Sequence, residues 1–384
     1  MRVKLKDAFN LQMGKTPSRA DLSLWGGNNK WISIADIGSA KKHISSTKEC
    51  ITDEGVSRSG IKVVPEGTVI MSFKLSIGKT AIVSEDMYTN EAIMAFIDNG
   101  TYCIDPNYLY HLCCGTDWTQ GGNKAVMGLT LNKATLSEME IELPTIEEQR
   151  EIASILDQLD AIIEKRHDEL NMIEQLVKSR FIELFGDYDL THPQESWATI
   201  KEVGTVVGGA TPKTDHDEYW GGSYRWITPA ELDADSGYIY DSVRKLTKAG
   251  VESCSLQEMP VGTVILSSRA PIGKVAIAGN TFYCNQGFKN IICKEGITPR
   301  YLYTVLLLNV EYLNSLGRGA TFKEISKGIV ESIRIPVPSM ELQEQFAAFV
   351  EQTDKSKYFA CQTLSFLLKL ANNLQSWREK QYDY

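Results

Sequence analysis

Two long stretches of the chain carry apolar residues at the three- and four-residue spacing of one helix face. The first, residues 145–185, contains neither proline nor glycine. Thr145 and Glu148 form the T-x-x-E pattern of a capping box, and Gly186 stands where helix ends favour glycine. A helix of this length would extend roughly 60 Å, which is too long for the core of one compact domain. The pattern therefore predicts a strut within a coiled coil.

The second stretch follows Pro338 and repeats the first. Pro144 and Pro338 are 194 positions apart, and at that offset Gln149 matches Gln343. A single helix of this kind is ordinarily a structural coiled coil, but its duplication and its acidic, apolar-striped surface favour the docking of a partner protein. The apolar positions predicted to contact that partner are Ile152, Leu156, Leu159, Ile163, Phe346, Val350, Leu364 and Leu368.

The two segments that precede these helices also repeat each other. The sequences G-x-T-P, W-G-G, W-I, G-T-V-I and I-G-K begin at residues 14, 25, 31, 67 and 77, and again 195 positions later. So many identities at one offset indicate a tandem duplication. The predicted organisation is a domain at 1–144, a long helix at 145–186, a second domain at 187–338 and a second long helix at 339–384.

Each repeated domain has a mixed pattern of helix and strand. Short β-branched runs bounded by glycine and proline predict strands, and apolar runs that open with proline predict short helices. The segment before each long helix is expected to be extended. The predicted strands are 67–73, 79–83, 262–266 and 274–278, the predicted helices are 106–113 and 299–308, and the extended segments are 132–143 and 326–337.

Length and composition are those of a globular protein. With 384 residues and a 43% hydrophobic content, the chain is long enough for two or three domains with sizeable cores. It has no run of 18 apolar residues and no apolar leader, so we expect neither a membrane span nor secretion. The eight cysteines make no C-x-x-C pair, and the five histidines are too scattered for a metal site. Reduced thiols fit a cytoplasmic protein.

The net charge of −9 is concentrated in the two predicted helices. Residues 145–185 hold 10 acidic and 5 basic residues, and residues 339–384 hold 6 and 5. The remaining segments, 1–144 and 186–338, are nearly neutral. If the chain binds nucleic acid, it must use a local basic patch rather than a positive field over the whole protein.

Two kinds of loop are candidates for such a patch. Residues 15–18 and 211–213 are small, polar and basic, and they adjoin glycines that would let the backbone approach a phosphate. Residues 72–74 and 267–269 follow predicted strands, and Arg269 is the first choice for reading guanine in the major groove. The alternatives are simple turns and solvated hairpin tips.

A third candidate is the flexible basic loop at 317–323, whose counterpart in the first domain is 121–124. Trp31 and Trp226 are expected to be core residues rather than platforms for bases. The full set of predicted DNA contacts is Lys15, Thr16, Ser18, Ser72, Lys74, Lys79, Lys124, Thr211, Lys213, Ser268, Arg269, Lys274, Arg318, Thr321 and Lys323.

Two segments resemble enzymatic motifs but lack residues that those motifs require. Residues 76–80, S-I-G-K-T, end like a phosphate-binding loop, but Phe73 replaces the first glycine and the repeat has Val275 in place of the threonine. The D-P-N-Y sequence at 105–108 lacks the second proline of the amino-methyltransferase tetrad, and its repeat reads T-P-R-Y. We therefore predict no catalytic activity and no metal or cofactor bound by this chain.

The order of these motifs, repeated twice, resembles the specificity (S) subunits of type I restriction-modification systems over essentially the whole chain. The resemblance also includes L-P-x-x-E-E-Q-x-x-I-A at 143–153 and the segment from Gly319 to Pro336. It implies an α/β (α+β) fold with two tandem target-recognition domains, each binding one half of a split DNA site. It also implies that the two long helices pair as an antiparallel coiled coil with pseudo-two-fold symmetry.

The same resemblance implies a set of partners. These are double-stranded DNA, two methyltransferase (modification) subunits docked on the helices, and a restriction motor-nuclease subunit. S-adenosylmethionine, ATP and Mg²⁺ would belong to the partner subunits. Two other hypotheses remain open on the residues alone: a coiled-coil adaptor without a DNA role, and a self-contained DNA methyltransferase or nuclease.

Overall fold

The computed structural model describes residues 1–74, 76–118, 123–125, 128–232, 237–254, 256–319 and 323–380, with the backbone alone at 123–125, 128–130 and 372–380. Contacts divide the chain into two compact units. One comprises residues 1–168 and the C-terminal part from Cys361, and the other comprises residues 169–360.

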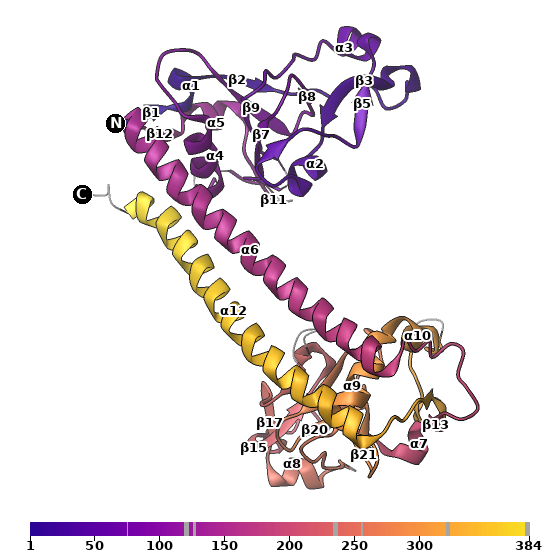
Figure 1. The fold of residues 1–384 in the computed structure, drawn as a ribbon. Coiled ribbons are helices and arrows are strands. Elements are labelled where there is room, and N and C mark those ends of the chain that lie inside the picture. The colour runs from indigo at the N-terminus through magenta and orange to yellow at the C-terminus, as the bar shows by residue number, and fades with distance from the viewer. Residues whose placement is uncertain are drawn as a thin grey trace. The chain divides into compact units, whose positions relative to one another are not determined.

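The two predicted long helices are present (Figure 1). Helix α6 (Ile146–Phe185) has 40 residues and helix α12 (Met340–Lys380) has 41. The predicted capping box forms, because the Thr145 N–H donates to the Glu148 carboxylate at 2.9 Å and the Glu148 N–H donates to the Thr145 hydroxyl at 3.3 Å. Gly186 ends α6 with a φ of 90°, in the left-handed region that favours glycine.

The first domain is built around a five-stranded sheet with the order β2-β9-β6-β7-β4, accompanied by a three-stranded sheet β5-β3-β8 and the pairs β1-β12 and β10-β11. Its elements are β1 (Arg2–Lys4), α1 (Leu5–Ala8), β2 (Phe9–Met13), η1 (Leu22–Leu24), β3 (Trp25–Ile32), α2 (Ile34–Ser39), β4 (His43–Ile44), β5 (Glu49–Ile51), α3 (Asp53–Ser59), β6 (Val69–Ser72), β7 (Thr80–Val83), β8 (Tyr88–Thr89), β9 (Ile93–Asp98), α4 (Pro106–Gly115), β10 (Asn123–Ala125), β11 (Gly128–Thr130), α5 (Lys133–Glu138) and β12 (Glu140–Glu142).

The second domain repeats this topology. Its five-stranded sheet has the order β14-β21-β18-β19-β16, and its three-stranded sheet has the order β17-β15-β20. Its elements are β13 (Ala198–Thr199), α7 (Ile200–Val203), β14 (Gly204–Gly208), η2 (Asp217–Tyr219), β15 (Trp220–Ile227), η3 (Pro229–Glu231), β16 (Tyr238–Ile239), β17 (Arg244–Leu246), α8 (Lys248–Glu252), β18 (Val264–Leu266), β19 (Val275–Ala278), β20 (Tyr283–Cys284), β21 (Lys289–Cys293), α9 (Pro299–Leu308), α10 (Val310–Ser315), α11 (Lys327–Ser332) and β22 (Arg334–Ile335). The duplication inferred from sequence is therefore a duplication of structure.

Both faces of each five-stranded sheet are buried, which explains the continuous apolar runs of its strands. On β6, Val69 and Met71 face a core that includes α4, whereas Ile70 faces a separate core on the opposite side. In the second domain Val264 and Leu266 lie in one core, and Ile265 lies in another.

The segments before the two long helices were predicted to be extended, and this prediction is wrong over most of their length. Each begins with a short helix, α5 or α11, and only then forms a strand. Asn132 caps α5 by accepting a hydrogen bond from the Thr135 N–H at 2.8 Å, and Ser326 caps α11 in the same way. Each helix buries one apolar residue, Leu136 or Val330. A six-residue helix with a single buried side chain has too short an apolar pattern to be recognised in the sequence.

In the second unit, the C-terminal part of α6 packs against the N-terminal part of α12. The rings of Phe181 and Phe346 lie 5.4 Å apart, and farther along the Glu174 carboxylate lies 2.8 Å from the Lys357 ammonium. Because residue numbers rise on one helix as they fall on the other, these two segments run antiparallel.

Candidate nucleic-acid interface

The G-x-T-P motif forms a loop that lies against the backbone after β8 or β20. The Lys15 N–H donates to the Thr89 carbonyl at 2.9 Å, and the Ala210 N–H donates to the Cys284 carbonyl at 3.0 Å. A Cβ atom added to Gly14 or Gly209 would lie 2.1 Å from that same carbonyl oxygen. The glycine of the motif is therefore required by close backbone approach, not by a ligand.

The threonine of this motif bonds to a different residue type in each domain. The Thr16 hydroxyl donates to the Glu91 carboxylate, whereas the Thr211 hydroxyl donates to the Gln286 amide oxygen at 2.5 Å. These bonds hold the loop to the segment that follows β8 or β20. Both threonines retain some exposed surface, and their contact with DNA stays a prediction.

A pair of tryptophans supports each loop. The Trp31 and Trp226 indole N–H groups donate to loop carbonyls at 3.0 and 3.1 Å, and both side chains are buried, as expected for core residues. Trp25 and Trp220 pack edge-on against them and donate to the carbonyls of Ser18 and Lys213. The side chains of Lys15, Ser18 and Lys213 stay exposed above this platform.

Of the three serines predicted to contact DNA, Ser72 and Ser268 are placed by the structure where DNA cannot contact them. Ser72 is fully buried: its hydroxyl donates to the Ser76 carbonyl and accepts from the Lys79 N–H at 3.1 Å. Ser268 is also fully buried and accepts a hydrogen bond from the Lys289 ammonium at 3.3 Å. The Ser72 hydroxyl stabilises the turn after β6, whereas the Ser268 hydroxyl contacts Lys289 on β21, and DNA cannot reach either.

The two equivalent lysines of this turn differ. The Lys274 ammonium is half-buried and donates to the Pro229 carbonyl at 3.2 Å and the Leu232 carbonyl at 2.7 Å, so it ties the turn to η3 instead of facing DNA. The prediction that Lys274 contacts DNA is therefore wrong. Lys79 is exposed, and Lys74 is half-buried with its ammonium 5.2 Å from the centre of the Phe73 ring.

Arg269, the first choice for a base contact, is held in an ion-pair cluster. Its Nε lies 3.0 Å from the Glu324 carboxylate, which also lies 3.1 Å from the Lys289 ammonium. Although partial burial opposes ionisation of Glu324, the two cations hold the pKa of its carboxyl below the usual value. Since about half of its side chain is exposed, Arg269 can still offer donors to a ligand.

The basic loop after α10 joins the same cluster. The backbones of Arg318 and Glu324 exchange two hydrogen bonds of 3.1 and 3.0 Å, and the side chains of Arg318 and Lys323 are exposed. The predictions at Thr321 and at the Lys124 side chain lie outside the described part of the chain.

These loops are continuous in the second domain because the segment between β20 and β21 connects them. Gln286 contacts the motif loop through Thr211, while the Gly287 carbonyl accepts from the Ser268 N–H at 2.8 Å. We call the surface formed by residues 210–213, 267–274, 284–289, 317–319 and 323–324 the loop band. Its exposed cations come from three separate loops and are Lys213, Arg269, Arg318 and Lys323, a pattern suited to a phosphate backbone.

Asp105 and Thr298 begin the D-P-N-Y sequence and its repeat, which resemble a methyltransferase tetrad. Both residues are helix caps. The Asp105 carboxylate accepts from the Asn107 and Tyr108 N–H groups at 2.9 and 3.1 Å, and the Thr298 hydroxyl accepts from the Tyr301 N–H at 3.3 Å. The S-I-G-K-T sequence lies in a turn between two strands and is not followed by a helix. Neither motif has the structural context that its chemistry requires.

A buried glutamine fixes each domain to the start of its long helix, and its role was not predicted. The Gln149 side chain accepts from the Asp105 N–H at 2.9 Å and donates to the Cys103 and Pro144 carbonyls at 3.1 and 3.0 Å. Gln343 makes the same three bonds to Thr298, Gly296 and Pro338, at 2.8, 3.0 and 2.9 Å. The sequence signal for this shared role was the match of Gln149 with Gln343 in the repeat.

Farther along each helix, the ionic contact with the domain differs. In the first domain the buried His111 lies 2.7 Å from the Asp157 carboxylate, which Lys42 also contacts at 2.5 Å. Burial lowers the pKa of His111 despite this carboxylate. In the second domain Arg300 contacts Asp354 at 2.8 Å.

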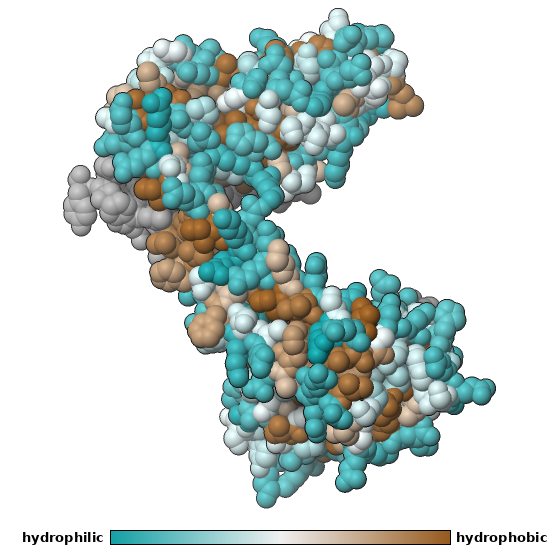
Figure 2. All heavy atoms as spheres, in the orientation of Figure 1, coloured by the Kyte–Doolittle hydropathy of each residue, from teal (hydrophilic) through white to brown (hydrophobic). Residues whose placement is uncertain are grey.

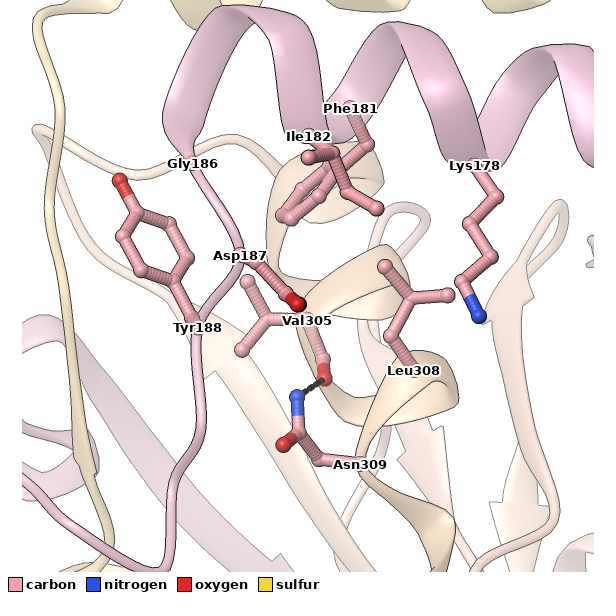
Figure 3. Close-up of a pocket in the computed structure, with 9 residues that line it drawn as sticks. All are labelled: Lys178, Phe181, Ile182, Gly186, Asp187, Tyr188, Val305, Leu308 and Asn309. Carbon is pink, nitrogen blue, oxygen red and sulfur yellow. Dashed lines mark hydrogen bonds between the residues drawn. The ribbon is translucent and has the colours of Figure 1, made fainter.

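A pocket lies where the end of α6 meets α9 (Figure 3). The side chains of Phe181 and Ile182 approach Val305 and Leu308, and the Asn309 amide donates to the Val305 carbonyl at 2.9 Å. The full lining is Lys178, Phe181, Ile182, Gly186, Asp187, Tyr188, Val305, Leu308 and Asn309. Its apolar wall places the helix end on the domain, and we assign no chemistry to it.

The apolar stripe predicted to dock a partner is largely inside the chain. Phe346 and Val350 belong to the core of the second domain, and Leu156 and Leu159 are also buried. Ile152, Ile163 and Leu364 are half-buried, and Leu368 is exposed. The buried members of the set cannot meet a partner, since a helix pattern does not reveal whether its apolar face packs against its own domain or another protein.

Several apolar side chains of the helices are exposed, and apolar surface is visible along the helices in Figure 2. In the first unit these are Ile155, Ile162, Phe366, Leu368 and Leu370, and in the second unit they are Met172, Leu176, Tyr358 and Phe359. No helix within the described residues is long and apolar enough to cross a membrane.

Comparison with known proteins agrees with this architecture. A family model described as the type I restriction modification DNA specificity domain matches residues 1–175 and 194–359. Because the match covers most of the chain in two copies, the chain belongs to this family.

Two curated relatives show how far the similarity extends. The type I restriction enzyme MjaIX specificity subunit of Methanocaldococcus jannaschii is 42% identical over 185 residues, which is 47% of this chain and 43% of the relative. The match thus spans less than half the length of that protein. The EcoprrI specificity subunit of Escherichia coli is 23% identical over 92% of this chain and 87% of the relative.

Solved structures share the fold at low sequence identity. A chain from a study of assembly and conformational transition of the type I R-M system has a TM-score of 0.60 at 18% identity, covering 98% of this chain and 96% of that one. The S subunit from M. genitalium has a TM-score of 0.57 at 15% identity, covering 98% and 94%. This likeness confirms the mixed α/β fold with two sheet-bearing domains and long helices.

Proposed function

We propose that this chain is the non-catalytic DNA-recognition subunit of a type I restriction-modification complex, with each domain reading one half of a bipartite site. The observation that carries this proposal is the repeated scaffold with unlike surface residues. The glycine, tryptophan and glutamine contacts recur in both domains, whereas the exposed side chains around them differ. One scaffold with two different surfaces suits a DNA site with two different halves.

The long helices suit the role of a spacer. Two contacts fix each domain to its helix. The first is the set of three hydrogen bonds made by a buried glutamine, and the second is the ionic contact farther along the helix. A domain held at two points cannot turn freely on its helix. Helix length then sets the number of base pairs between the half-sites, as dimer geometry does in other DNA-binding proteins.

The exposed apolar residues of α6 and α12 support docking of two methyltransferase subunits, and a restriction motor-nuclease subunit would join through them. Exposed aromatic and aliphatic side chains such as Phe359 and Phe366 are costly in water and typical of interaction surfaces. S-adenosylmethionine, ATP and Mg²⁺ are proposed to bind the partner subunits.

Genome-wide mapping of adenine methylation tests the proposal. The chain is co-expressed with the methyltransferase encoded beside it, and the methyltransferase alone is the control. We expect methylation that requires this chain, at a split motif with two unlike halves. Removing one heptad, about two turns, from both helices should shorten the gap and leave both halves unchanged.

Two results would contradict the proposal. Methylation that ignores this chain, or that falls on a continuous motif, would favour a coiled-coil adaptor without a DNA role. Binding of S-adenosylmethionine by the purified chain alone would favour a self-contained methyltransferase.

A further inference from the structure

Each tryptophan pair carries an arginine stacked on its outer ring. In the first domain the Arg19 guanidinium carbon lies 3.7 Å from the centre of the Trp25 ring. In the second domain the Arg244 guanidinium carbon lies 3.6 Å from the centre of the Trp220 ring. The two domains thus place the same group at the same point of their scaffold.

The two arginines nevertheless come from different positions in the repeat. Arg19 follows the motif loop, and its counterpart at the 195-residue offset is Thr214. Arg244 opens β17 and pairs with Trp226 across the strands, and its counterpart on β5, paired with Trp31, is Glu49. Position 49 therefore carries a carboxylate where position 244 carries a guanidinium.

This exchange reverses the local charge. In the first domain Glu49 binds Arg19 through both oxygens, at 2.5 and 2.8 Å, and hydrogen bonds from Arg19 lower the pKa of the Glu49 carboxyl. The paired donors of Arg19 are thus occupied. A phosphate approaching this surface would also meet the carboxylate.

The second domain has no such neutralisation within the described residues. Arg244 is exposed and forms no ion pair with a described residue. The neighbouring carboxylate of Asp241 is already engaged by Arg225 and Lys245, each at 3.1 Å. Lys213, whose backbone carbonyl accepts from the Trp220 indole at 3.3 Å, is a second exposed basic residue of this region.

A guanidinium stacked on an indole has one face covered while the N–H groups at its edge stay accessible. Such an edge donates two parallel hydrogen bonds to paired acceptors, and the ring beneath it reduces the freedom lost on binding. On duplex DNA, paired acceptors are offered by phosphate oxygens and by the O6 and N7 atoms of guanine.

We propose that Arg244, stacked on Trp220, is a DNA contact of the second domain that the first domain lacks, because Glu49 there occupies the donors of Arg19. This inference rests on the proposed function. It predicts that the two half-sites are held with unequal electrostatic strength, even though the scaffolds are equivalent.

The test measures binding of the complete complex, this chain with its methyltransferase, to a duplex carrying the mapped motif over a range of salt concentrations. Arg244→Gln should weaken binding roughly tenfold. It should also make the fall of log K with log salt less steep, by about one unit of slope. Arg244→Lys should keep the slope but not the full affinity. The matched control Arg19→Gln should change affinity less than about twofold.

Methylation mapping with the same variants separates the two acceptors. An unchanged motif with the lower slope identifies a phosphate, whereas relaxation of one guanine position in one half identifies a base edge. If Arg244→Gln leaves affinity, slope and motif unchanged in a complex that binds DNA, this inference is wrong and the proposed function stands. A wild-type complex that does not bind DNA would overturn both.

Discussion

The two domains of this chain share their interior and differ at their surface. Both use a glycine to let the motif loop approach the backbone, a tryptophan pair to support that loop, and a buried glutamine to fix the domain to its helix. At the surface, Glu91 stands where Gln286 stands, and Glu49 where Arg244 stands. Buried contacts must be preserved for the fold to form, whereas exposed side chains can diverge with the ligand that each domain meets.

The two domains differ in how deeply the first turns of their long helices are buried. Phe346 of α12 is fully buried among the aromatic rings of Phe181, Phe185 and Tyr301, whereas Ile152, at the equivalent place on α6, is half-buried. Phe346→Ala should destabilise the second unit by about 4 kcal/mol, because it leaves a large cavity. Ile152→Ala should cost about half as much. Urea unfolding monitored by circular dichroism measures both, and equal losses would show that the two helix starts are anchored alike.

The glutamine contact should behave identically in both domains. Gln149→Leu and Gln343→Leu each leave one backbone N–H and two carbonyls without partners in a buried place, at a cost of about 3 kcal/mol. Gln158→Leu, an exposed change on the same helix, should alter stability by less than about 0.5 kcal/mol. A large difference between the first two variants in thermal unfolding would contradict the equivalence of the two attachments.

The ionic contacts should give the domains different pH responses. Burial lowers the pKa of His111 below its usual 6.5, so the unfolded chain binds more protons than the folded chain as the pH falls through that value. The free energy of unfolding of the first domain should thus be highest above pH 6.5 and should decline as the pH falls below that value. The corresponding contact of the second domain joins Arg300 to Asp354 and contains no histidine.

Hydrogen exchange read by mass spectrometry follows the two contacts separately. Peptides from α4 should lose protection between pH 7 and 5.5 after correction for the intrinsic exchange rate, and peptides from α9 should not. His111→Gln should remove the difference. Parallel loss of protection in both helices would mean that His111 does not govern the effect.

Glu49→Gln is expected to have only a small effect on stability. Its ion pair with Arg19 is about half exposed, so removing it should change the free energy of unfolding by less than about 1 kcal/mol. The freed Arg19 would then resemble Arg244, and the salt slope of DNA binding should rise by about one. Titration of the complex at several salt concentrations measures this, and an unchanged slope would mean that the first domain does not present this surface to DNA.

Part of the candidate interface was accessible from the sequence. Gly14 and Thr16 were singled out by their repeat and Lys15 by its charge, and all three lie in a loop beside the tryptophan pair. Ser72 and Ser268 were misassigned, because a polar residue after a strand looks the same whether it is buried in a turn or exposed to a ligand. Arg244 was missed, although a charge reversal against Glu49 in the aligned repeat was a usable signal.

The sequence by itself determined the duplicated plan: the extent of α6, the start of α12, the strands β6, β7, β18 and β19, and the motifs that join them. These features are local, since helix periodicity, capping and turn residues act over a few positions. Only the tertiary structure decided which side chains remain available at the surface. Arg269 meets Glu324 across 55 positions, Arg244 meets Trp220 from another strand, and Phe346 is buried against α6. Such contacts depend on how distant elements pack, and packing is decided by the shape of the whole core rather than by any local pattern.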